Sequence, residues 1–220
     1  MNTPQLATIK ADLHRYLSNR KSLLSLEFNA VVEDVAAFTS AVICEGFDRA
    51  LAALPNFFQE LLGRPFIEVA DVIAEHHLRF AQTSERDVVR KSLLEAYIHA
   101  AGPQYVFRPP DQKRILRSLR RAGPRNFVAM LFSLHVFNLI SMAIEDEVRV
   151  KMTDVTTFEL YMLGVETICQ TVVKGAVKNE RTVVDERWVK AVAMNIEAQL
   201  LNIPLNRRQS RQSMLSGHKK

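Results

Sequence analysis

Apolar residues recur along this chain with the spacing of α-helices. Between residues 24 and 42, six of them are separated by 4, 3, 4, 3 and 4 positions. Because an α-helix turns once in about 3.6 residues, such positions form the seam on which a helix packs lengthwise against a neighbour. Stretches 158–176 and 189–203 carry similar stripes. The seam consists of Leu24, Phe28, Val31, Val35, Phe38 and Val42.

Proline, glycine and capping residues divide the chain into about eight helices. Pairs such as Gly102-Pro103 and Gly123-Pro124 are strong stop signals, whereas Thr3, Ser84 and either Thr153 or Thr156 are expected to cap helix starts. The loop at 103–109 holds the most strand-like residues, Tyr105, Val106 and Phe107, but it is too short to build a sheet. The predicted helices span about 3–18, 22–54, 65–82, 84–101, 110–123, 125–151, 156–176 and 184–202, with a further short helix indicated at 56–63.

The stretch from Asn126 to Ile144 contains no charged residue and is the most apolar part of the chain. Its length suits a short transmembrane helix, which is one interpretation. However, Ser133, His135 and Asn138 lie near its middle, where each would be costly in lipid without a partner. We therefore expect a core helix that other helices surround, and we regard an integral membrane span as the weaker alternative.

These patterns predict an all-α fold: a single-domain bundle of about eight helices around a central apolar helix at approximately 125–150. The helical domain should cover residues 1–204, and residues 205–220 form a basic tail without periodicity that we expect to be disordered. The composition agrees, because 48% hydrophobic and 24% charged residues are ordinary globular values. The N-terminus shows no charged segment followed by an apolar one, so we expect an intracellular, cytoplasmic protein.

Positive charge is concentrated in two segments, although the formal net charge is only +5. Residues 108–125 hold seven cations and one acid, and residues 207–220 hold five cations and no acid. The remainder of the chain is therefore mildly acidic. A helical face of arginines attracts polyanions, since each phosphate contact releases condensed counterions. The predicted polyanion-binding residues are Lys113, Arg114, Arg117, Arg120, Arg121, Arg125, Arg207, Arg208 and Arg211.

Two serines in the tail, Ser210 and Ser213, follow arginines in a layout that basophilic kinases accept. Phosphorylation there would weaken the grip of a basic arm on an anion. No sequence signature of an established RNA- or DNA-binding module accompanies the basic segments.

Other candidate chemistry is sparse. His135, among apolar neighbours, is a candidate ligand of a haem or another small molecule, although a lone histidine of this kind is more often a core residue. Asp71, Glu75, His76 and His77 lie close together in sequence, but His76 and His77 should point about 100° apart on a helix, so we expect no metal site. Cys44 and Cys169 fit two buried, reduced thiols better than a disulfide.

No GxSxG elbow, phosphate-binding loop or GxGxxG turn occurs, which favours a non-enzymatic protein without a cofactor. An enzyme is the open alternative, because an all-helical active site can assemble from residues that are distant in sequence. The first hypothesis is a binding or scaffold protein whose basic helix and tail engage a polyanion, nucleic acid first, or an acidic protein surface. The second is a helical sensor of a small ligand or haem that uses His135. The third is a homo-oligomer whose seam at 24–42 packs between chains.

Overall fold

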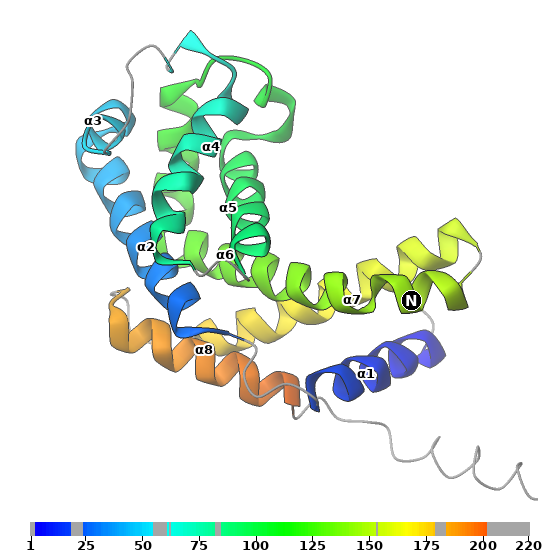
Figure 1. The fold of residues 1–220 in the computed structure, drawn as a ribbon. Helices are drawn as coiled ribbons and strands as arrows, with labels where there is room; N and C mark the ends of the chain where they lie inside the picture. Colours follow the sequence, from blue (N-terminus) through cyan, green and yellow to red (C-terminus); the bar gives the residue numbers. More distant parts are fainter. Residues whose placement is uncertain are drawn as a thin grey trace, which may run out of the picture.

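The computed structural model describes residues 3–18, 24–54, 61, 63–81, 85–152, 154–178 and 184–201. These residues form eight α-helices and two short 3-10 turns without a β-strand, so the predicted all-α bundle is confirmed (Figure 1). The helices are α1 Thr3–Ser18, α2 Leu26–Glu45, α3 Phe47–Ala52, α4 Phe66–His77, α5 Arg86–Ala101, α6 Gln112–Lys151, α7 Val155–Lys178 and α8 Glu186–Leu201. The turns are Leu78–Phe80 after α4 and Pro103–Tyr105 after α5.

Helix α6 lies at the centre of the bundle, as the sequence predicts, and packs against α1, α2, α3, α5 and α7. Its apolar face buries Phe127, Leu131 and Phe132 completely or nearly so. The seam of α2 is also buried inside the single chain, with Phe28 standing edge-on to the ring of Phe132 at 5.6 Å. The homo-oligomer hypothesis therefore loses the surface on which it was based.

The central helix is long and apolar enough to cross a membrane, but within the described residues 61% of its most apolar window is buried against the protein itself. Two of its polar residues have partners inside the bundle, whereas the ring nitrogens of His135 and the hydroxyl of Ser141 have no described partner. The amide of Asn138 donates to Ser92 Oγ at 3.1 Å and to Glu95 Oε2 at 2.9 Å, both on α5. Ser133 donates to the carbonyl of Ala129 one turn earlier. These features are typical of a core helix.

Two glycines set breaks between helices. Gly123 has φ 73° and ψ 161°, so α6 kinks at the Gly123-Pro124 pair where the sequence predicts the end of one helix and the start of the next. Gly46 has φ 99° and separates α2 from α3. The predicted continuous helix over 22–54 is therefore wrong, because a left-handed backbone at Gly46 interrupts it.

The strand-like residues at 105–107 do not form a strand. The carbonyls of Val106 and Arg108 instead accept hydrogen bonds from Ile67 and Phe66, at 3.0 and 2.7 Å. These donors belong to the first turn of α4, whose N–H groups have no partner within the helix. The loop thus caps α4.

Aspartates rather than threonines cap two of the later helices. Asp154 accepts from the backbone N–H of Thr157 at 2.8 Å, so the expected cap at Thr156 is wrong. Asp185 does the same for Trp188 at the start of α8. The expected caps at Ser84 and Thr153, most of the short helix at 56–63 and the tail at 205–220 lie outside the described residues.

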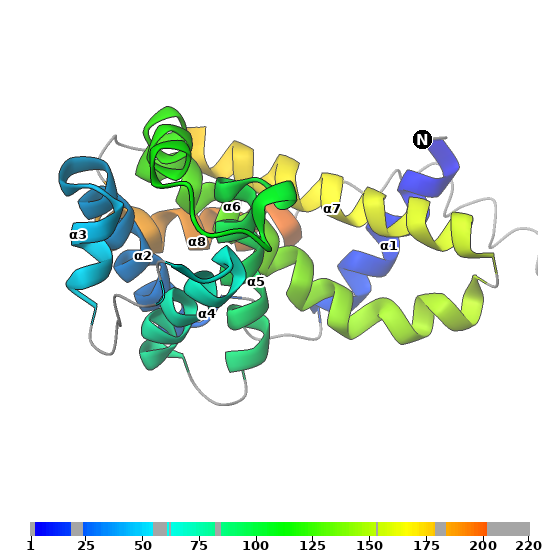
Figure 2. The ribbon, with the colours of Figure 1, turned by 90° about the horizontal axis from the view of Figure 1, so that it is seen from above.

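The C-terminal part of α6 and the N-terminal part of α7 form an antiparallel hairpin that projects from the rest of the bundle (Figure 2). We call this hairpin the arm. Helix α1 lies alongside it and makes three polar contacts with α6 and α7, one of them from the Tyr16 hydroxyl to the carbonyl of Leu139 at 3.5 Å. Tyr161 donates to Asp12 Oδ2 at 2.9 Å, and Arg15 donates to Glu147 Oε1 at 2.6 Å.

Candidate functional site

The basic segment begins α6 and is helical, as predicted. Asp111 caps it by accepting from the backbone N–H of Arg114 at 3.1 Å. Ile115 and Leu119 are each 3% exposed and face the core. Because these residues anchor one side of the helix, the cations between them are left on the opposite side.

The centre of that opposite side is a cationic strip of Lys113, Arg117 and Arg121, which we call the basic strip. The three residues are exposed and follow one another at intervals of four, so each is about 40° round the helix from the last. Within the described residues none of them hydrogen-bonds or pairs with a carboxylate. The charge of the basic strip is therefore available to a ligand.

The two edges of this face bind the protein's own backbone. Arg114, on one edge, donates to the carbonyl of Ala101 at 3.0 Å and lies over the ring of Tyr105 at 3.9 Å. Arg120, on the other edge, donates to the carbonyl of Ile43 at 3.3 Å. These two arginines therefore make structural hydrogen bonds to neighbouring helices.

Arg125, just after the kink, completes a group of three arginines with this role, because it donates to the carbonyl of Val177. The accepting carbonyls lie in the last turns of α5, α2 and α7. Carbonyls at a helix C-terminus lack partners and carry partial negative charge, so arginines stabilise them. Half of the predicted helical cations thus stabilise helix ends, and the tail residues Arg207, Arg208, Ser210, Arg211 and Ser213 lie outside the described residues.

His135 is fully enclosed in the core. Its ring stacks on Phe28 with centroids 3.6 Å apart, and neither ring nitrogen has a described partner. Burial lowers its pKa to about 3, so the imidazole is neutral near pH 7. A groove of about 600 Å³ runs between α6 and α7, but Arg125, Met130 and Val177 line it and His135 does not. The stacked ring leaves no room for a haem on its Phe28 side.

The two cysteines are both free, so the disulfide alternative is wrong. Cys169 is buried as expected, and burial raises the pKa of its thiol to about 12. Cys44, near the end of α2, is exposed, which corrects the expectation of two buried thiols.

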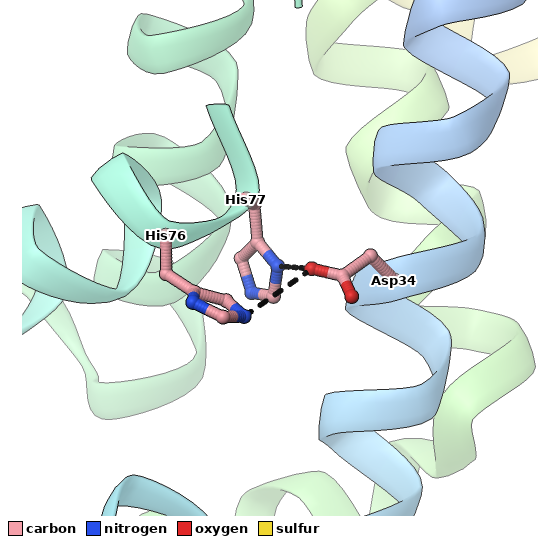
Figure 3. Close-up of side chains that lie close together, drawn as sticks. All are labelled: Asp34, His76 and His77. Carbon is pink, nitrogen blue, oxygen red and sulfur yellow. Dashed lines mark hydrogen bonds and ion pairs between the residues drawn. The ribbon is translucent and has the colours of Figure 1, made fainter. Parts of the chain in front are cut away.

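A polar cluster that the sequence did not reveal lies between α2, α4 and α5. His77, at the last position of α4, is completely buried and is held from both sides. Its Nδ1 lies 2.6 Å from Asp34 Oδ2 on α2, and its Nε2 lies 2.8 Å from the hydroxyl of Tyr97 on α5. The neighbouring His76 approaches the same oxygen of Asp34 at 3.7 Å (Figure 3). Arg79 donates to Asp34 Oδ1 at 2.8 Å.

Burial and charge act in opposite directions on these groups. Burial lowers the pKa of His77 against the raising effect of Asp34, and burial together with the charge of Arg79 lowers the pKa of His76. Burial works to raise the pKa of Asp34, but the His77 hydrogen bond and the nearby cations outweigh it, so that pKa is lowered. Burial raises the pKa of Tyr97 well above its usual value. The cluster therefore holds one carboxylate, two neutral imidazoles and a neutral phenol near pH 7.

The acidic residues that sequence proximity suggested as partners of His76 and His77 are engaged elsewhere. Glu75 accepts from Arg86 at 2.5 Å, and Asp71 pairs with Arg90. The actual carboxylate, Asp34, precedes His77 by 43 positions. Sequence spacing within α4 cannot reveal this partner, because Asp34 lies on another helix, α2.

Comparison with known proteins gives no family model, no curated protein and no solved structure that matches this chain.

Proposed function

We propose that this chain is a non-enzymatic binding protein that uses the basic strip on α6 to engage a polyanion. The observation that carries the proposal is the exposure of Lys113, Arg117 and Arg121 on one helical face without a described acidic partner. Cations that paired with carboxylates of the same molecule would have little charge to offer.

Nucleic acid is the ligand that this arrangement favours over an acidic protein surface. Successive cations at intervals of four lie about 6 Å apart along a helix axis, which is close to the spacing of phosphates along one nucleic-acid strand. The flat guanidinium of arginine also forms paired hydrogen bonds with phosphate oxygens. The flanking arginines, Arg114 and Arg120, hold the strip in register because they are attached to α5 and α2.

Titration of the full chain into fluorescently labelled single-stranded RNA and duplex DNA tests this proposal. Binding should weaken steeply with salt, because three phosphate contacts give a slope of about −2 on a single strand and about −3 on a duplex in a plot of log K against log salt. Any contact from the tail would add to this slope. Fluorescence anisotropy at about 50 and 200 mM salt measures it directly.

The decisive variant replaces all three residues of the basic strip by glutamate: Lys113→Glu, Arg117→Glu and Arg121→Glu. Its matched control changes three exposed cations elsewhere, on α3, α5 and α8, and alters net charge equally: Arg49→Glu, Lys91→Glu and Arg187→Glu. The first variant should lose binding at low salt, while the control should keep most of it. Equal losses in both variants would show that net charge alone attracts the ligand, and absence of wild-type binding at low salt would refute the proposal.

A further inference from the structure

We propose that Asp34, His76 and His77 form a binding site for a divalent metal ion of the zinc class. Their ligand-type atoms lie within 4.8 Å of one another, and they come from two helices that close on the same point (Figure 3). Two imidazole nitrogens and one carboxylate oxygen suit zinc, cobalt or nickel, whereas magnesium and calcium prefer oxygen ligands alone. The site is separate from the basic strip and does not depend on the function proposed for it.

The spacing of the ligand atoms is close to what such an ion needs. Ligands about 2.0–2.2 Å from a tetrahedral zinc ion are about 3.4 Å from one another. Asp34 Oδ2 lies 2.6 Å from His77 Nδ1 and 3.7 Å from His76 Nε2, values on either side of that distance. The two histidine nitrogens lie within 4.8 Å of each other, so the third distance must shorten by no more than about 1.4 Å to reach the tetrahedral value.

The surroundings hold one side of the site and leave the other open. His77 is completely buried, and its Nε2 lies 2.8 Å from the hydroxyl of Tyr97. When Nδ1 binds the ion, the protonated Nε2 can donate a hydrogen bond to this hydroxyl. Such a second partner is the usual support of a histidine that binds a metal. His76 and Asp34 are 12% and 19% exposed, so an ion can enter from solvent and water can fill the remaining position.

Arg79 occupies the site in its metal-free form. Its guanidinium donates to Asp34 Oδ1 at 2.8 Å and lies against the His76 ring, with one nitrogen 2.7 Å from Nε2 and 3.1 Å from Nδ1. A guanidinium in this position neutralises the carboxylate that an ion would need and repels the charge of the ion. The side chain of Arg79 is 45% exposed, which allows it to swing out into solvent. Arg79 therefore competes with the metal, and its removal should strengthen binding. A purely structural ion-pair network makes no such prediction.

Calorimetric titration of the chelator-treated full chain with zinc chloride tests the site, and cobalt chloride supports it through its visible absorption. Wild type should bind one zinc ion per chain at this site. The variant His76→Gln should bind at least ~10-fold more weakly, and Arg79→Met several-fold more tightly. Matched controls are His99→Gln, an exposed histidine on α5, and Arg90→Met, an equally exposed arginine that pairs with Asp71 and Glu75.

Circular dichroism establishes that each variant is folded before titration. If His76→Gln binds zinc as tightly as wild type, the proposal is overturned. It is overturned equally if Arg79→Met gains no affinity over Arg90→Met, since that variant leaves all three ligands in place. Zinc uptake that falls with His99→Gln to the same extent as with His76→Gln would assign the binding to surface histidines.

Discussion

Replacement of His135 by leucine should remove part of the acid sensitivity of the fold. The imidazole is completely buried, stacks on Phe28 and has no described hydrogen-bond partner. Protonation would place an uncompensated charge in the core, which is why burial lowers the pKa of His135 from 6.5 to about 3. The unfolded chain binds this proton more readily than the folded one. The free energy of unfolding therefore falls as the pH is lowered through the pKa of the unfolded state.

The size of the effect follows from the two pKa values. Well above pH 6.5 the ring is neutral in both states, so His135 contributes nothing to the pH dependence of stability there. Below that value the unfolded state gains a proton, and stability falls by about 1.4 kcal/mol per pH unit until the folded pKa is reached. Between pH 7.5 and pH 5 wild type should therefore lose about 2 kcal/mol more than His135→Leu.

Urea unfolding followed by circular dichroism at several pH values measures this difference. Other groups also titrate in this range, but they are common to both proteins and cancel in the comparison. At pH 7.5 the variant should be within about 1 kcal/mol of wild type, because the lost ring stacking is offset by removal of two unpartnered nitrogens. Parallel curves of stability against pH for the two proteins would refute the reasoning.

Three substitutions test the roles assigned to backbone geometry and to the structural arginines, each by urea unfolding. Gly123→Ala should destabilise the protein by about 1 kcal/mol or more, because Gly123 has a positive φ although no atom lies within 4 Å of the added methyl group. Gly175→Ala should be neutral or stabilising by up to about 1 kcal/mol, since the methyl group meets the flexible end of Gln199 inside a regular helix. Arg125→Met should cost about 1–2 kcal/mol by leaving the Val177 carbonyl without its donor. A Gly175→Ala variant less stable than Gly123→Ala and Arg125→Met would contradict these assignments.

The helices could be predicted where local chemistry decides their ends. The Gly102-Pro103 and Gly123-Pro124 pairs act on the backbone beside them, and both lie where the structure ends or kinks a helix. Gly46 was missed because apolar periodicity continues on both sides of it and a glycine inside a helix is tolerated. The positive φ of Gly46 depends on how α2 and α3 pack, which the local sequence does not show.

The sites were predictable only in part, because their partners are distant in sequence. The spacing of the basic residues correctly placed them on one helical face, but it could not show which of them are engaged. Arg114, Arg125 and Arg120 reach carbonyls 13, 52 and 77 positions away. The cluster around His77 has the same origin, since a helix shows which of its own residues share a face and nothing about the helix opposite.

The way in which α1 holds the arm has a consequence for how the molecule opens. Helix α1 is held by three polar contacts with α6 and α7 and by its buried residues Ile9 and Leu13, whereas α2, α5 and α7 make the main contacts with α6. Detachment of α1 would wet one side of the α6–α7 hairpin and leave the core around Phe28 and Phe132 intact. Amide hydrogens near the tip of the arm should thus exchange through a partial opening of lower free energy than global unfolding, so that the arm and the body behave as two cooperative units.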